Sequence, residues 1–318
     1  MKVTVVGAGG NVGSTVAYTI AERDFAKEVV MLDIEKKEGD KTFYPSKGRA
    51  LDQWETAPIQ GFDTRLKGTV DYNDTKGSDV CVITAGVPRR PGMSRDDLLG
   101  INGNIVKTVT EQLVKHSPDT IIIVVSNPLD VMTYVSYAAS KLDKKKVMGM
   151  AGILDTARYR AFLAEELDVS PKDIQAMLMG GHGDTMVPLP RYTTVSGIPV
   201  TQLIDADRLD AIVERTKTGG GEIVGLMGTS AWYAPGAAAA QMVEAIMLDQ
   251  NRIFPCAAYL EGEFGINDLF IGVPVKLGHG GIKEIIEIDL TDSEKELLRA
   301  SEKAVRSTLD DYNKLMDK

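Results

Sequence analysis

Histidine is the side chain best suited to move a proton near neutral pH, and this 318-residue chain has only three of them. His182 lies in the segment GGHGD, between glycines and after a strand-like run, where it has little to pack against. Asp155 and Arg158 are three residues apart in GILDTARYR, so a helix would place them on one face. His182 is therefore the candidate acid or base. We expect His116, near a helix end, and His279, in a less specific loop, to be structural.

A glycine-rich loop, GAGGNVG at 7–13, follows the first strand-like run and precedes a helical stretch. Gly7 allows a tight turn, and Gly13 lets the helix pack closely on the sheet. Either Gly9 or Gly10 would let the backbone approach a pyrophosphate, which would lie at the helix N-terminus, where free N–H groups and the helix dipole favour an anion. The loop predicts a dinucleotide site that also includes Asn11 and Val12. A merely structural turn is the alternative.

Asp33 ends the second strand-like run, 20 residues after Gly13. An acidic side chain at this position accepts hydrogen bonds from the adenosine ribose hydroxyls and repels a 2′-phosphate, so the sequence predicts NAD rather than NADP. Lys36 and Lys37 could attract a phosphate or could be ordinary loop charges. The segment that follows, up to about Arg49, is long. It is either a solvent loop or a contact with the cofactor or another subunit.

Three arginines occur within seven residues of the segment TAGVPRRPGMSRDDL at 84–98, namely Arg89, Arg90 and Arg95. The segment follows a strand-like run, so it lies at the carboxyl edge of the sheet, where doubly wound folds bind ligands. A guanidinium can grip a carboxylate with two parallel hydrogen bonds, and a loop of this kind can close over a substrate and exclude water. The alternative is a solvated surface loop. Asn127, in SNPLD after another strand, could orient a nicotinamide or a substrate hydroxyl, or could be a turn residue.

Strand-like and helical stretches alternate in the first half of the chain, and they must position these side chains. The apolar runs cover residues 2–6, 29–33, 80–85 and 120–126, and helices are predicted at 14–25 and about 94–116. Continuous apolar strands separated by helices are typical of a parallel sheet that is covered on both faces. The sequence predicts the α/β class, with an N-terminal Rossmann domain built on a doubly wound parallel sheet. A different α/β architecture is the alternative.

The second half has a more mixed pattern. Helices are expected at 153–167, 205–216 and 236–249 and from Asp292 onward, with strand-like pieces at 174–179, 253–260, 270–277 and 283–289. This predicts a C-terminal α+β substrate domain. We place the domains at 1–148 and 149–318. Because no Pro/Gly-rich linker separates them, they should pack closely.

Composition excludes several function classes. The formal net charge of −9 argues against a general nucleic-acid binder. The longest aliphatic run is far short of a membrane span, and the first residues do not resemble a signal peptide, so we expect a cytoplasmic protein. Two cysteines without a Cys-x-x-Cys motif make a structural metal site improbable, and no metal is predicted.

Taken in order, GAGGNVG, Asp33, TAGVPRRPGMSRDDL, VSNPLD, GILDTAR and GGHGD resemble the NAD-dependent malate and lactate dehydrogenases across essentially the whole chain. The chain is most similar to the lactate-dehydrogenase-like malate branch found in bacteria. The resemblance implies that His182 is the acid/base, paired with Asp155, and that Arg158 binds the substrate's C1 carboxylate. It also implies that Arg95 polarises the reacting carbonyl, that Asn127 contacts substrate and cofactor, and that Asn102 and the turn from Val125 to Asn127 line the NAD site.

The resemblance also points to the residue that sets the substrate. Malate and lactate enzymes of this family differ six positions before Arg95, which here is Arg89, and lactate enzymes resemble this pattern with a glutamine there. An arginine would pair with the second carboxylate of oxaloacetate or malate, whereas a buried unpaired arginine would reject pyruvate. Arg90 is expected to face solvent.

The resemblance thus implies a malate dehydrogenase of the tricarboxylic acid cycle that interconverts oxaloacetate with NADH and malate with NAD. A lactate or other 2-hydroxy-acid dehydrogenase is one alternative. A non-catalytic NAD-binding regulator on the same scaffold is the other, although it would need neither His182 nor convergent arginines. By resemblance, a homo-oligomer is expected, with a tetramer favoured over a dimer.

Overall fold

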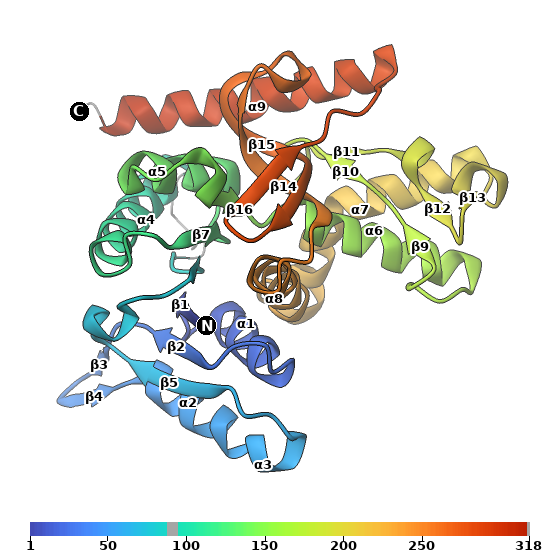
Figure 1. The fold of residues 1–318 in the computed structure, drawn as a ribbon. Helices are drawn as coiled ribbons and strands as arrows, with labels where there is room; N and C mark the ends of the chain where they lie inside the picture. The colour runs from blue at the N-terminus through green and yellow to red at the C-terminus, as the bar shows by residue number, and fades with distance from the viewer. Residues whose placement is uncertain (88–94, 317–318) are drawn as a thin grey trace.

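The computed structural model describes residues 1–87 and 95–316, and within these ranges nine strands form one sheet (Figure 1). The strand order is β16-β15-β14-β8-β7-β6-β1-β2-β5. Six strands are parallel, namely β1 (Lys2–Val6), β2 (Glu28–Leu32), β5 (Arg65–Thr69), β6 (Val80–Ile83), β7 (Ile121–Val124) and β8 (Val147–Gly149). Numbered by their place in the chain, they run 3-2-1-4-5-6 across the sheet, which is the doubly wound Rossmann order. The predicted fold class is confirmed.

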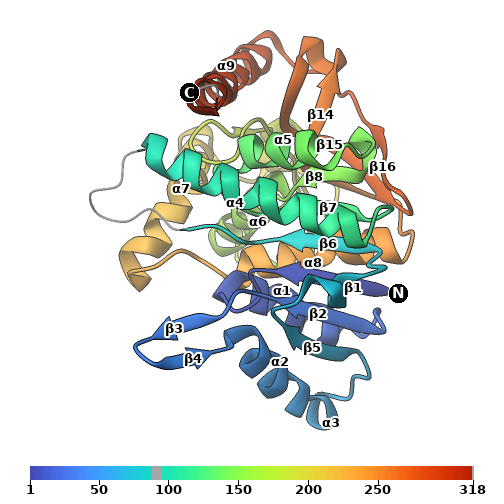
Figure 2. The ribbon, with the colours of Figure 1, turned by 90° about the vertical axis from the view of Figure 1, so that its left-hand side faces the viewer.

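Helices cover both faces of this sheet. Figures 1 and 2 show one pair of helices, α4 (Arg95–His116) and α5 (Leu129–Ser140), on the opposite side of the sheet from α1 (Asn11–Glu22) and α8 (Tyr233–Met247). Helix α8 belongs to the second half of the chain but packs against α1, where Gly236 lies against Thr15. Helix α2 (Pro45–Glu55), which is followed by the short α3 (Ala57–Gln60), packs on β5. The C-terminal helix α9 (Asp292–Met316) lies beside α4 and α5.

The core lies in the sheet and between it and these helices. Strands β6 (VCVI) and β7 (IIIV) are buried along their whole length, as their continuous apolar sequences predict. Each Val or Ile removed from water contributes about 1.5–3 kcal/mol before conformational entropy is counted. The carboxyl ends of β1 and β6 lie side by side, with Val6 paired to Ile83. The topological switch point is therefore at this edge.

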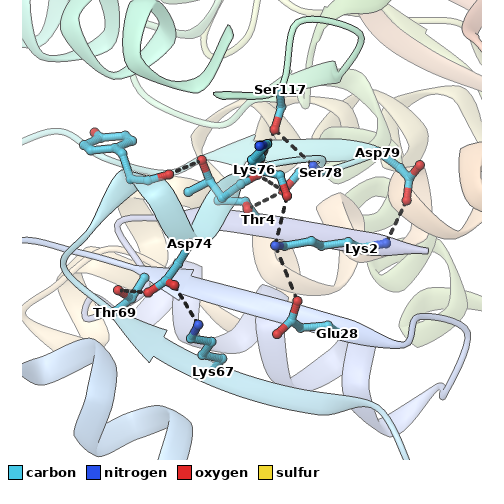
Figure 3. Close-up of polar contacts among 12 residues, drawn as sticks. Lys2, Thr4, Glu28, Lys67, Thr69, Asp74, Lys76, Ser78, Asp79 and Ser117 are labelled. Atoms are coloured by element: carbon cyan, nitrogen blue, oxygen red, sulfur yellow. Dashed lines mark hydrogen bonds and ion pairs between the residues drawn. The ribbon is translucent and has the colours of Figure 1, made fainter. Parts of the chain in front are cut away.

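A polar cluster lies at the amino end of the same strands, away from the switch point (Figure 3). The hydroxyl groups of Thr4 and Ser78 are 2.7 Å apart, and the Ser117 hydroxyl accepts from the Ser78 N–H at 3.0 Å. The Lys2 N–H donates to Asp79 at 2.7 Å. Because the buried hydroxyl groups of Thr4, Ser78 and Ser117 have hydrogen-bond partners, they tie β1, β6 and the end of α4 together without the cost of unpaired polar atoms.

The second half of the chain extends the same sheet. Strands β14 (Arg252–Glu261), β15 (Asn267–Gly278) and β16 (Gly281–Ile285) are antiparallel, and β14 pairs with β8 through Ala257 and Gly149. Helices α6 (Gly152–Leu167) and α7 (Ala206–Met227) lie in a lobe beside it, seen at the right of Figure 1. This lobe also carries the short strands β9 (Ile174–Gln175), β10 (Leu178–Met179), β11 (Val187–Pro188), β12 (Thr194–Val195) and β13 (Ile198–Pro199).

Two sequence expectations in this half differ from the structure. The strand expected at 174–179 is two short strands, because β9 pairs with β12 whereas β10 pairs with β11. The helix expected to end at 216 continues to Met227 through three consecutive glycines, Gly219 to Gly221. Glycine has a low helix propensity, so the sequence predicts that the helix ends before these residues. The packing of α7 against α6 outweighs this preference, and the helix continues.

The long segment after Asp33 forms a hairpin of β3 (Lys36–Glu38) and β4 (Lys41–Phe43), with every residue in both strands exposed. Lys36 lies 3.6 Å from Glu38, and Lys37 lies 3.2 Å from Glu35. The two lysines are thus paired locally with carboxylates, which favours the interpretation as ordinary loop charges.

No helix among residues 1–87 and 95–316 is both long and apolar enough to cross a membrane. In the same residues, no three His, Cys, Asp or Glu side chains are grouped so that they could hold a metal ion. Cys81 and Cys256 are buried free thiols. Burial raises the pKa of Cys81 to about 12 and that of Cys256 further still, so neither thiol is a nucleophile at neutral pH.

Candidate active site

The glycine loop lies at the switch point between β1 and β6. The Gly7 N–H donates to the Leu32 carbonyl at 2.9 Å, and Gly7 has a φ of +83°, which side chains rarely adopt. A Cβ on Gly7 would lie 2.7 Å from the Thr84 hydroxyl, and one on Gly13 would lie 2.6 Å from the Gly7 carbonyl oxygen. Both positions therefore require glycine because of close backbone approach.

Asp33 joins the end of β2 to this loop. Its carboxylate accepts from the Gly9 N–H at 2.7 Å and from the Ile34 N–H at 2.8 Å. A Cβ on Gly9 would lie 2.7 Å from the same carboxylate, so Gly9 makes room for Asp33. A Cβ on Gly10 would meet only the Gly7 carbonyl, at 3.2 Å, among the described residues. Of the two glycines that could admit a pyrophosphate, Gly10 is the one with an open side.

The start of α1 fits an anionic ligand. Gly10 is its N-cap residue, and no side chain of the described residues caps the helix there. The N–H groups of Asn11, Val12 and Gly13 therefore lack a capping partner at the positive end of the helix dipole, as a pyrophosphate site requires. The Asn11 side chain is held by Arg49, whose Nη2 donates to it at 2.8 Å. The residues present thus fit a dinucleotide.

Asn102 connects two loops at the carboxyl edge. Its Oδ1 accepts from the Val87 N–H at 2.8 Å, and its Nδ2 donates to the Asn127 carbonyl at 2.8 Å. The Val125 N–H donates to the Ile83 carbonyl at 2.8 Å, which extends the pairing of β6 and β7. Asn102 is buried, so its amide holds the two loops in place at the carboxyl edge of the sheet. Asn127 is exposed, so its side chain is accessible to a ligand.

His182, Asp155 and Arg158 come together although 27 residues separate the histidine from the aspartate. Nδ1 of His182 lies 2.9 Å from Oδ2 of Asp155, and Nη1 of Arg158 lies 3.4 Å from Oδ1 of the same carboxylate. Asp155 is buried, with 2% of its side chain exposed, while 21% of the His182 side chain remains exposed. Because a carboxylate only accepts hydrogen bonds, Nδ1 must donate, and Nε2 is left to exchange a proton.

Electrostatics favour the charged imidazolium. Burial alone would lower the pKa of His182, but the charge and hydrogen bond of Asp155, assisted by Asp130, outweigh it and raise the pKa above 6.5. His182, Asn127 and Asp130 line a common cleft of about 540 Å³ between the start of α5, the histidine loop and α9. The cleft gives a ligand access to a histidine whose surroundings stabilise its protonated form.

Sequence reasoning did not identify the residues that hold the histidine loop. Gly180 pairs with Gly272 of β15, with its N–H 2.9 Å from the carbonyl, and the Gly181 N–H donates to the Ser301 hydroxyl at 2.7 Å. The His182 N–H donates to Asp130 at 3.0 Å. Asp130 lies within SNPLD, the segment in which the sequence indicated only Asn127 as a candidate site residue. Its partner is a backbone group 52 residues away, so the sequence holds no direct signal for the contact.

Gly219 is a second residue that sequence reasoning missed. A Cβ on this residue of α7 would collide with the Cδ of Arg158 and lie 2.9 Å from its Nε. The glycine therefore leaves the space that the arginine side chain occupies. The run TGGGE inside a helical pattern was the available signal, because glycine in a helix interior usually has a packing or functional reason.

The structure describes some, but not all, of the remaining arginines and histidines considered in the sequence analysis. Arg89 and Arg90 lie outside the described residues. Arg95 is the first residue of α4, and its side chain is not among the described ones. His116 ends α4, where a cation suits the helix dipole, and His279 is exposed after β15.

Comparison with known proteins gives family matches along nearly the whole chain. Residues 1–149 match the lactate/malate dehydrogenase NAD-binding domain, and residues 153–316 match the lactate/malate dehydrogenase alpha/beta C-terminal domain. A malate dehydrogenase of Salinibacter ruber is 66% identical over 317 residues, covering 100% of this chain and 98% of that protein.

Solved structures of malate dehydrogenases have the same fold as this chain. The structure of malate dehydrogenase from Salinibacter ruber has a TM-score of 0.93 at 63% identity and covers 100% of this chain and 99% of its own. Malate dehydrogenase from Plasmodium falciparum in complex with NADH has a TM-score of 0.90 at 34% identity and covers 99% of each chain. With an NAD-binding domain at its N-terminus and these full-length relatives, the chain belongs to the lactate/malate dehydrogenase family.

Proposed function

We propose that this chain is an NAD-dependent malate dehydrogenase, which reversibly transfers a hydride between NADH and oxaloacetate to give (S)-malate and NAD. The observation that carries the proposal is the pairing of the partly exposed His182 with the buried Asp155, 2.9 Å apart, with Arg158 beside them. The high identity to proteins named malate dehydrogenase supports the choice of substrate.

The chain's own residues would perform the proton transfer and the substrate binding. Bound NADH supplies the hydride. His182, protonated at Nε2, delivers a proton to the carbonyl oxygen of oxaloacetate, and Asp155 holds the imidazole and stabilises its charged form. In malate oxidation neutral His182 removes the hydroxyl proton. Arg158 holds the C1 carboxylate through charge-assisted hydrogen bonds.

We infer the remaining substrate contacts from the sequence. Arg89 would pair with the second carboxylate, and Arg95 would polarise the reacting carbonyl. Asn127 would contact both substrate and cofactor. This arrangement favours a dicarboxylate over pyruvate, the substrate of a lactate enzyme. A regulator that only binds NAD would not need His182, because it transfers no proton.

The cofactor contacts follow from the loop geometry. We propose that the backbone at Gly10 lies against the pyrophosphate, that the N–H groups of Asn11, Val12 and Gly13 bind it, and that Asp33 accepts from the adenosine ribose. Gly7 and Gly9 shape the loop, and Asn102 and Val125 line the site at the edge of the sheet.

The test is the initial rate of NADH oxidation with oxaloacetate, compared with pyruvate and with NADPH as the cofactor. Oxaloacetate with NADH should give by far the highest kcat/KM. Equal or higher kcat/KM with pyruvate would favour the lactate alternative, and no turnover with any substrate would favour the regulator.

We also propose that residues 1–148 and 149–318 are the NAD-binding and substrate domains, and that the protein is a cytoplasmic homotetramer. The exposed apolar side chains of α2 and α8 support a subunit contact, since Leu51 is 60% and Tyr233 72% exposed. Light scattering on the purified chain would measure its mass.

Gly219→Ala should damage substrate binding while the chain still folds. The new methyl group would push the Arg158 side chain aside, so the KM for oxaloacetate should rise by roughly 10-fold or more. Gly221→Ala is the matched control, because no described atom lies within 4 Å of its Cβ position. It should leave the KM unchanged and stabilise α7 by about 0.5–1 kcal/mol. Equal KM values in the two variants would contradict the role given to Gly219.

A further inference from the structure

A second buried carboxylate, Asp130, touches the segment that carries His182 and has no part in the reaction described above. Its Oδ2 accepts from the His182 N–H at 3.0 Å. Its Oδ1 is buried and has no hydrogen-bond partner among the described residues. We propose that Asp130 is a positioning residue that holds the His182 backbone and supplies a second negative charge to the imidazolium. This inference rests on the acid/base role proposed for His182.

The place of Asp130 in the fold suits a charged acceptor. It lies in the first turn of α5, where the helix dipole stabilises a carboxylate, and it is only 7% exposed. It faces the cleft that His182 also lines. A buried carboxylate with one unused oxygen is costly unless a cation lies near it, and His182 is the neighbouring group that can become one.

The charges around the histidine favour the protonated state. Asp155 approaches from α6 and Asp130 from α5, while Arg158 adds one positive charge. Helix α9 lines the cleft with Ala304, Val305, Ser307 and Thr308, which carry no charge. Asp184 also lines the cleft, but its carboxylate is exposed, so solvent screens its charge. Among the less exposed groups, the carboxylates of Asp130 and Asp155, Arg158 and protonated His182 sum to zero, whereas neutral His182 leaves a net charge of −1. Removing Asp130's charge should therefore make the imidazolium easier to deprotonate.

This placement also determines the direction in which each pKa shifts. Burial raises the pKa of Asp130 to about 6, although the hydrogen bond and charge of His182 oppose that rise. Asp130 contributes in turn to raising the pKa of His182. The two groups therefore titrate as neighbours, and each should sense the protonation of the other.

The experiment is an NMR titration of the full-length chain labelled in its histidine rings, without substrate. With three histidines, His116 and His279 serve as internal references. Asp130→Asn keeps an acceptor for the His182 N–H but removes the charge, so the pKa of His182 should fall by about half a unit or more. Asp184→Asn removes an exposed carboxylate two residues from His182 and should leave its pKa unchanged. An unchanged His182 pKa in Asp130→Asn overturns the proposal.

The wild-type chain provides a second test if Asp130→Asn does not fold. The His182 resonance should show its own inflection and a further one as Asp130 is protonated at lower pH. A single-step curve overturns the proposal. Because the titration needs no substrate, a chain that failed to reduce oxaloacetate would refute the proposed function and leave this result standing.

Discussion

His182→Ala is expected to lower kcat for oxaloacetate reduction by about 10²–10⁴-fold, the usual contribution of a positioned general acid. The variant loses the group that delivers the proton, and Asp155 is left without its imidazole partner. NADH binding should persist, because the glycine loop contacts Asp33 and Thr84 rather than the histidine loop. The measurement is steady-state kcat together with NADH affinity by fluorescence.

The two other histidines provide the controls for this experiment. His116→Ala and His279→Ala change the end of α4 and an exposed loop after β15. Neither should lower kcat. Near-normal turnover in His182→Ala, or an equal loss in all three variants, would show that the acid is another group.

Arg89→Gln is expected to change the choice of substrate. The ratio of kcat/KM for oxaloacetate to that for pyruvate should fall by about 10²-fold or more, since each charge-assisted hydrogen bond to the second carboxylate contributes about 1.5–3 kcal/mol. Activity on pyruvate should rise, because a glutamine no longer leaves an unpaired cation beside a methyl group.

Arg90→Gln is the matched control, since it removes the same charge from the neighbouring position. It should leave the ratio unchanged. If Arg89→Gln also left the ratio unchanged, the second carboxylate would be bound elsewhere. If Arg90→Gln alone lowered it, the two arginines would have to exchange their proposed roles.

The strands at the centre of the sheet could be predicted because burial on both faces leaves a continuous apolar run, as in IIIV of β7. The edge strand β5, with the sequence RLKGT, was missed because it alternates exposed with buried residues and carries a glycine. Strand β8 has only three residues, too few for a pattern. Its pairing with β14 extends the sheet across the proposed domain boundary, which no local sequence feature indicates.

The site was predictable where a motif carries its own chemistry. His182, Asp155 and Arg158 stand in recognisable segments, and the structure brings them together. The supporting contacts were not predictable, because Asp130 and Ser301 bind backbone N–H groups, which every residue has. Gly219 matters because the absence of a side chain leaves room for Arg158. The only indication of this in the sequence was an unusual run of glycines in a helix.

The most direct test of the central claim is the pH dependence of kcat/KM in both directions of the reaction. Oxaloacetate reduction needs protonated His182, so its kcat/KM should fall as the pH rises through a pKa above 6.5. Malate oxidation needs the neutral imidazole, so its kcat/KM should rise with pH through the same group. Opposite limbs that share one pKa, and that both disappear in His182→Ala, are the predicted result. Limbs of the same sign, or limbs that persist in the variant, would contradict the account.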